Sequence, residues 1–170
     1  NLGVSVTIGR EGDGELFIDQ GGKLVIDGAD DANPALIIGR GSNGSGNGDV
    51  FATGLATVTG TGSSIDLYGT NTVHGPTSFG NIVLSGSMAV GLRNGAEGEL
   101  QILDGGRVSL HGPKTGFSIA DDRGAQGTVR VDGASSLLQA GSSLNIGMAG
   151  ASNGGPDVVF DPTDGGVGLV

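Results

Sequence analysis

The amino-acid sequence predicts an all-β protein, a right-handed parallel β-helix in which three sheets enclose one core over about six rungs. Three observations support this prediction. Glycine makes up 37 of 170 residues, and an interior glycine costs a helix roughly 1 kcal/mol, which argues against helices. Apolar residues alternate with other residues over short stretches, as strands require. These stretches also recur along the chain, which is the signature of a solenoid.

Five similar segments define the repeat. Their central residues are separated by 30, 52, 29 and 27 residues, and they are Ile8, Ile38, Val90, Ile119 and Ile146. The value of 52 indicates one repeat plus an irregular insertion, which we place near residues 69–86. We therefore interpret residues 1–170 as a single solenoid segment, and the abrupt start and end of the sequence suggest a piece of a longer protein.

Each repeat is expected to contain three strands with one apolar pair apiece. The first strands carry Val6/Ile8, Leu36/Ile38, Met88/Val90, Phe117/Ile119 and Leu144/Ile146. The second strands carry Leu16/Ile18, Val50/Ala52, Leu100/Ile102 and Val129/Val131. The third strands carry Leu24/Ile26, Ile65/Leu67 and Val108/Leu110, with Leu137 or Leu138 as a fourth member. Alternate residues face one side of a strand, so stacked repeats would bury three continuous rows of side chains. An antiparallel sandwich or barrel is the alternative, but it predicts no fixed repeat.

The charge and composition narrow the possible partners. The formal net charge is −10, from 8 basic and 18 acidic residues. Such an acidic surface disfavours binding to nucleic acid, whose phosphates require clustered Lys and Arg. It also disfavours anionic membranes, and no apolar run is long enough to span a bilayer, so we expect no membrane insertion by this segment. The chain has no cysteine, which excludes disulfides and thiolate metal sites.

A carbohydrate-active enzyme, a polysaccharide lyase or hydrolase, is one alternative function, because parallel β-helices also occur in such enzymes. It would require clustered carboxylates or residues that handle sugar acids. The catalytic candidates are Asp19 and Asp132, which occupy equivalent strand ends, with Asp104 shifted by one residue. Strand-end aspartates more often cap turns and face water. We therefore expect no catalytic residues and no enzyme activity.

A second column of polar residues is chemically mixed. Asp27, Tyr68 and His111 occupy approximately equivalent positions in three repeats. His74, the other histidine, falls in the insertion, and no zinc-binding or nucleophile-elbow motif is present. No long loop surrounds the column to form a pocket, so we expect these residues to be structural.

Calcium is the metal that the sequence favours most, although no metal or other cofactor is expected to be required. Ca²⁺ takes six to eight oxygen ligands, which acidic and Gly-rich turns can supply. The candidate ligands lie at repeat junctions and are Asp30, Asp31, Asp121 and Asp122. The nonapeptide repeat of calcium-binding β-rolls is absent, and solvated acidic turns are the simpler interpretation.

Three arginines occupy near-equivalent positions in the Gly-rich loops. They are Arg10, Arg40 and Arg93, the last shifted by one residue. These loops superficially resemble phosphate-binding loops, but no GK[ST] follows them. We expect the arginines to pair with neighbouring acidic residues along one edge of the solenoid.

The glycine spacing and apolar alternation together resemble a known family. The pattern "IG…G.GEL.I..GG.L.I.G", followed by "L.IG…G.G.V…G…V.G.GS.I.L", resembles the autotransporter and PEP-CTERM associated β-helical repeat. The similarity covers about residues 4–68 and 86–155. Ala120 and Asp121 depart from it, since the family has glycine after the position of Ile119.

The resemblance implies a passenger-like stalk or adhesive surface of an exported bacterial protein, and it implies no catalytic residues. Expected partners are a host-cell or matrix surface, or neighbouring copies joined end to end. The expected location is extracellular or on the bacterial cell surface. A phage tail-fibre segment is a further alternative. It predicts an apolar outer seam, whereas the outward residues Thr7, Ile37, Ala89, Ser118 and Asn145 include one clearly apolar member.

Overall fold

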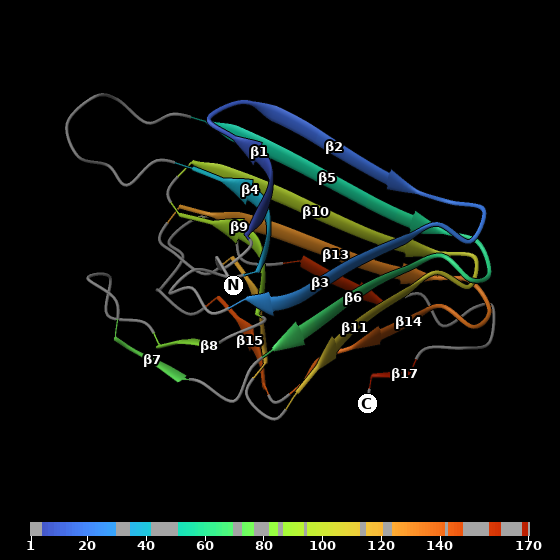
Figure 1. Cartoon of the computed structure of the whole chain (residues 1–170). Helices are drawn as coiled ribbons and strands as arrows, with labels where there is room; N and C mark the ends of the chain where they lie inside the picture. Colours follow the sequence, from blue (N-terminus) through green and yellow to red (C-terminus); the bar gives the residue numbers. More distant parts are fainter. Residues whose placement is uncertain are drawn as a thin grey trace.

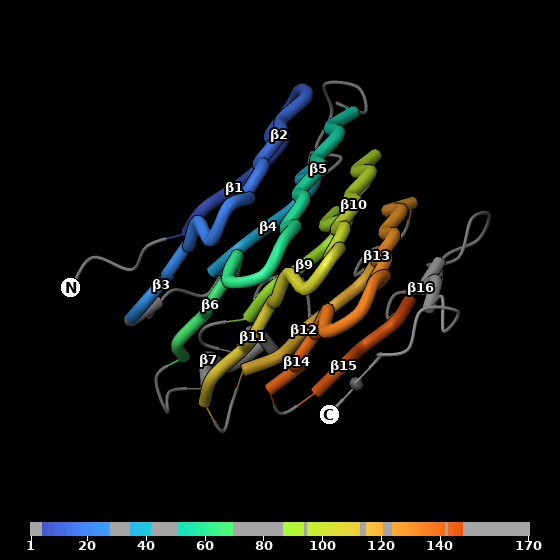
Figure 2. Tube along the Cα trace, turned by 90° about the vertical axis from the view of Figure 1, so that its right-hand side faces the viewer, coloured from blue at the N-terminus to red at the C-terminus, as the bar shows by residue number. Residues whose placement is uncertain are grey.

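A computed structural model describes most of the chain as three parallel β-sheets wound into one coil (Figure 1). The described residues are 5–29, 35–41, 51–69, 73–76, 82–84, 87–93, 95–112, 115–120, 124–141, 143–147, 157–160 and 168–169. Figures 1 and 2 together show the coil to be right-handed, with successive turns displaced along one axis. The predicted three-sheet parallel β-helix is therefore confirmed. The described part contains no helix able to cross a membrane.

Each of the three parallel sheets contains five described strands. Sheet A consists of β1 (Val6–Arg10), β4 (Leu36–Arg40), β9 (Met88–Leu92), β12 (Gly116–Ile119) and β15 (Ser143–Ile146). Sheet B consists of β2 (Asp13–Ile18), β5 (Ala52–Thr59), β10 (Ala96–Leu103), β13 (Gln126–Asp132) and β16 (Asp157–Phe160). Sheet C consists of β3 (Lys23–Ala29), β6 (Ser64–Gly69), β11 (Arg107–His111), β14 (Leu137–Gln139) and β17 (Gly168–Leu169). One strand of each sheet makes a rung, so these sheets define five rungs where the sequence suggested about six.

The pairing register confirms most of the predicted apolar positions. We call the residues at one position in successive rungs a file. In sheet A, Ile8 pairs with Ile38, Ile38 with Val90, Val90 with Ile119, and Ile119 with Ile146. In sheet C, Val108 pairs with Leu138, which identifies Leu138 rather than Leu137 as the inward residue. The exposed fractions agree, because Leu138 is 2% exposed and Leu137 is only partly buried.

One predicted pair is wrong. The sequence suggested Val50 and Ala52 for the second strand of rung two, but Leu100 pairs with Ala56 and Ile102 with Val58. Ala52 is also buried, but it lies four residues before Ala56 in β5 and pairs with Ala96. Val50 lies outside the described residues. Glycine-rich segments have weak local preferences, so the length of the preceding loop, and with it the register, was misjudged.

The insertion near residues 69–86 adds no rung. Ile38 of β4 and Val90 of β9 pair directly although 52 residues separate them in sequence. The described parts of the insertion are two short strands, β7 (Val73–Pro76) and β8 (Ile82–Leu84), which pair antiparallel with each other in a separate sheet. The solenoid therefore continues across the insertion without a break in register.

The core is fully enclosed only in the middle rungs. Leu36, Ile65, Leu100 and Val129 are all 0% exposed. At the first rung, Leu16 is only partly buried, because β2 is a terminal strand of its sheet. At the other end of sheet A, Ile146 is 47% exposed. The inward files thus open toward solvent at the ends of the described stack.

Two glycine files form the corner between sheets A and B. At the ends of four of the five sheet A strands, Gly9, Gly39, Gly91 and Gly147 have φ values of 70°, 71°, 72° and 67°. A β-carbon on Gly39 would lie 2.3 Å from the carbonyl oxygen of Glu97 in the next rung. Side chains are therefore excluded where the backbones of the two sheets meet. Ala120 occupies this position in rung four, with φ of 53° and 1% exposure.

Serine side chains connect the turns between sheets B and C. The amide of Gly21 donates a hydrogen bond to Ser63 Oγ at 3.1 Å, and the amide of Gly105 donates to Ser136 Oγ at 3.0 Å. Both bonds join one rung to the next. Gly105 is buried, and a buried backbone donor needs a partner, so Ser136 satisfies its amide, while Ser63 makes the equivalent contact at the exposed Gly21.

Candidate functional site

Two of the aspartates considered as catalytic candidates, Asp19 and Asp132, lie far apart. Asp19 follows Ile18, the last residue of β2, while Asp132 ends β13 three rungs away. With about 4.8 Å per rung, the two positions are roughly 14 Å apart. Glycosidases hold their two carboxyl groups within about 9.5 Å of each other. These two aspartates therefore cannot act as a catalytic pair.

Asp104 and Asp132 lie in adjacent rungs and both have partners. The register confirms that Asp132 aligns with Leu103, so Asp104 is shifted by one residue as predicted. Asp104 Oδ2 accepts a hydrogen bond from Thr59 Oγ1 at 3.4 Å, and Asp132 Oδ2 forms an ion pair with Arg130 Nη2 at 2.5 Å. Asp104 also has a left-handed φ of 51°. Both side chains thus lie at turns in the way that capping aspartates do.

The predicted column of Asp27, Tyr68 and His111 is present on the outer side of sheet C. Asp27 of β3 pairs with Tyr68 of β6, which pairs with His111 of β11. The rings of Tyr68 and His111 stack, with centroids 4.5 Å apart and an interplanar angle of 13°. Tyr68 is 41% exposed. One aromatic surface is therefore held in place by the strand register.

Asp66 completes this group, and sequence reasoning missed it. Asp66 Oδ1 lies 3.1 Å from His111 Nε2, and Asp66 Oδ2 accepts a hydrogen bond from Ser64 Oγ at 2.8 Å. The sequence signal was available, since Asp66 sits two residues before Tyr68 on the same outward side. It was overlooked because only residues of one file were compared, whereas diagonal neighbours in adjacent strands also touch.

The electrostatics of this group favour an ionised Asp66. Partial burial raises the pKa of Asp66. Hydrogen bonds from His111 and Ser64, together with the charges of His111 and Lys23, lower it by more, so the pKa of Asp66 lies below its usual value. The side chains of His111 and Asp66 are 37% and 23% exposed. The group can offer a carboxylate and an aromatic edge to a ligand. Its serine hydroxyl, Ser64 Oγ, donates its hydrogen bond to Asp66 Oδ2, whereas His111 Nε2 contacts Asp66 Oδ1, so Asp66 lies between the serine and the histidine and the two are not arranged as a nucleophile and its base.

The arginine column is also confirmed. Arg10 of β1 pairs in register with Arg40 of β4, and Arg40 pairs with Leu92, which places Arg93 one residue later. Arg93 has a left-handed φ of 76°. The expected ion pairs with acidic neighbours are not observed for Arg10 or Arg40 among the residues that the structure describes.

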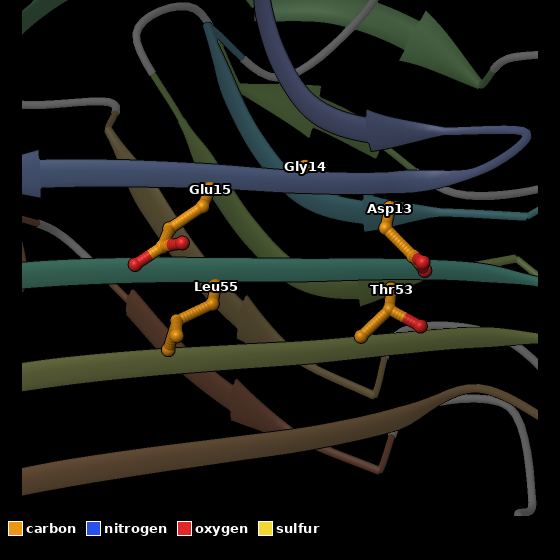
Figure 3. Close-up of a pocket in the computed structure, with 5 residues that line it drawn as sticks. All are labelled: Asp13, Gly14, Glu15, Thr53 and Leu55. Atoms are coloured by element: carbon orange, nitrogen blue, oxygen red, sulfur yellow. The ribbon is translucent and has the colours of Figure 1, made fainter.

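A shallow acidic depression lies on the outer side of sheet B. It has a volume of about 300 Å³, is open to solvent, and is lined by Asp13, Gly14, Glu15, Thr53 and Leu55. Figure 3 shows Asp13 beside Thr53 and Glu15 beside Leu55, on the neighbouring strands β2 and β5. The depression is too open to surround a small substrate in the way that most ligand pockets do.

The metal candidates cannot be placed. Asp30, Asp31, Asp121 and Asp122 lie outside the described residues. The side chain of His74 is likewise not described. Within the described ranges, no three His, Asp or Glu side chains come close enough to hold a metal ion.

Comparisons of the chain with known proteins find no relative that would assign a function to these sites. No family model, no curated protein and no solved structure matches the chain. The fold and the surface chemistry described above are therefore the basis for the functional proposal.

Proposed function

We propose that this chain is a structural or adhesive segment of a secreted or cell-surface bacterial protein, similar to an autotransporter passenger, that acts by presenting a rigid extended surface and not by catalysis. The observation that carries the proposal is the continuous register of five rungs around one core. Each inner strand is paired on both sides, so bending the rod requires breaking many backbone hydrogen bonds at once.

The arrangement of polar groups also supports this proposal. Asp19 and Asp132 are too far apart for paired-carboxylate chemistry, and Asp104 and Asp132 are held at turns by Thr59 and Arg130. The depression at Asp13 and Glu15 is shallow. These features suit contact with a large partner, such as a host-cell or matrix surface, better than enclosure of a substrate.

The ends of the stack support association of copies end to end as a second kind of contact. Val6, Leu16 and Leu24 in the first rung are only partly buried, and Ile146 in the last strand of sheet A is 47% exposed. The unpaired edges of terminal strands are templates for further strands. Light scattering across a concentration series would detect such association as a mass that rises with concentration.

The adhesive role is tested by measuring retention of the folded protein on cultured epithelial cells and on collagen- and fibronectin-coated plates. Plates coated with albumin are the control for non-specific retention. Saturable binding to cells or matrix supports the proposal, and equal retention on albumin contradicts it. The enzyme alternative is tested with the same preparation by following new reducing ends and unsaturated products from pectin and alginate. Turnover that disappears in Asp104→Asn or Asp132→Asn would overturn the proposal.

A further inference from the structure

The arginine column places like charges beside one another on adjacent strands. Arg10 and Arg40 share one file of sheet A, one rung apart, so their backbones are about 4.8 Å apart. Arg93 lies next to the same file in the third rung, directly after Leu92. A row of cationic side chains therefore runs parallel to the solenoid axis along the corner between sheets A and B.

The charges in this row repel one another. The pKa of Arg40 lies below its usual value, mainly because the side chain is partly buried. The positive charges of Arg93 and Arg10 lower this pKa further, and the negative charge of Glu11 raises it. In the part of the chain that the structure describes, the side chains of Arg10 and Arg40 have no hydrogen bond or salt bridge, so only the nearby charge of Glu11 offsets the repulsion at Arg40. Like charges facing each other across paired strands destabilise a sheet.

This row of positive charge stands out because the chain as a whole carries a net charge of −10. Arginine is also the side chain best suited to bind oxyanions, since its planar guanidinium offers two parallel donors to a carboxylate, sulfate or phosphate. A bound anion would reduce the repulsion between the arginines and accept charge-assisted hydrogen bonds from them.

We propose that Arg10, Arg40 and Arg93 form a binding site for a linear acidic glycan, whose sulfate or carboxylate groups lie along the solenoid axis. The fixed rung spacing sets the spacing of the donors, so a ligand with successive anionic groups can contact two or more arginines at once. The carboxylates of Asp13 and Glu15 lie on the outer side of sheet B and disfavour contact of such a ligand with that sheet.

This site names the ligand of the proposed adhesive surface, so it rests on the proposed function. Glycan binding is tested by calorimetric titration of the full chain with a heparin-derived tetrasaccharide, with inorganic sulfate, and with a neutral oligosaccharide of equal length. We expect the tetrasaccharide to bind, sulfate to bind more weakly, and the neutral sugar not to bind. Binding should weaken as salt is added, because exposed charges are screened.

The decisive variants are Arg10→Gln and Arg40→Gln, with Arg107→Gln as the matched control. Arg107 is exposed on the outer side of sheet C, so its substitution removes the same charge elsewhere. Loss of a charge-assisted hydrogen bond should weaken tetrasaccharide binding about tenfold or more in each corner variant, and less than about twofold in the control. Equal weakening in all three variants would show non-specific attraction and overturn the site.

A stability measurement separates binding from a purely structural role. If the arginines repel one another, Arg40→Gln should unfold at the same temperature as the unmodified protein or a higher one. A lower unfolding temperature, together with unchanged tetrasaccharide binding, would show that Arg40 is structural and overturn the inference. Absence of tetrasaccharide binding would also overturn it. If the protein were still retained on cells or matrix, the broader adhesive proposal would survive.

Discussion

Gly54 of β5 lies against Gly39 of β4, so closely that a β-carbon on Gly54 would come within 2.2 Å of the Gly39 amide nitrogen. The same approach recurs between Gly14 and Gly9 and between Gly98 and Gly91. These contacts join sheet A to sheet B along the corner. The abundance of glycine is thus partly a packing requirement, in addition to its role in turns.

The glycine contacts predict a graded series of alanine variants. Gly54→Ala should lower the free energy of unfolding by about 3 kcal/mol or more, because backbone atoms of two strands must move apart. Gly21→Ala has space for a side chain but a φ of 79°, and should cost about 1–2 kcal/mol. Gly12→Ala has neither constraint and should stay within about 0.5 kcal/mol of the original protein. Urea unfolding measures all three, and a large effect at Gly12 would contradict this account of the corner.

A second prediction compares two leucines of one inward file. Leu100 is 0% exposed in the middle of the stack, whereas Leu16 is partly buried at its first rung. Leu100→Ala should cost about 2–5 kcal/mol, because it leaves an enclosed cavity. Leu16→Ala should cost about 1–2 kcal/mol, since less apolar surface is lost from the core. Equal costs in chemical denaturation would indicate that the first rung is covered in solution.

A third prediction concerns the pKa of Asp66. His111→Ala and Ser64→Ala each remove a hydrogen bond to the carboxylate, so each should raise the Asp66 pKa toward its ordinary value. Carbon-13 NMR titration of the side-chain carboxyl measures this directly. Ser109→Ala is the control, because Ser109 pairs with Asp66 in register but is not among its hydrogen-bond partners. An unchanged pKa in His111→Ala would contradict the assigned contact.

The same group predicts how stability depends on pH. Because the pKa of Asp66 is lowered in the folded protein, ionised Asp66 stabilises the fold at pH values above 3.8, the ordinary pKa of an aspartate. This contribution is lost as the pH falls through the lowered folded value. Asp66→Asn should therefore be less stable than the original protein at about pH 6, with the difference disappearing at about pH 2. A difference that persists at the lower pH would show that charge is not its cause.

A further prediction tests whether the insertion is separable from the solenoid. Replacing residues 69–87 with the sequence of residues 112–116 would join β6 to β9 in the way that β11 is joined to β12. Since β4 already pairs with β9, the shortened chain should keep a single cooperative unfolding transition. Its unfolding temperature should fall by less than that of Gly54→Ala. A chain without cooperative unfolding would show that the insertion supports the core.

The sequence alone determined the fold class, the repeat and most inward residues, because alternation and spacing are local properties of the chain. Alignment of the repeats places Ile8, Ile38, Val90, Ile119 and Ile146 in one file, and these residues pair in that order. The arginine column follows from the same alignment. A repeat with a strict register transfers directly from sequence to space, since each rung sits on the equivalent residues of the neighbouring rung.

Only the tertiary structure decided features that depend on neighbours distant in sequence. It moved the rung-two pair from Val50 and Ala52 to Ala56 and Val58, because the length of a glycine-rich loop is set by where its ends are held. It joined Asp66 to His111 across 45 residues, a contact between diagonal positions that no single file contains. It also showed that the insertion near residues 69–86 adds no rung between Asp19 and Asp132, because β4 pairs directly with β9.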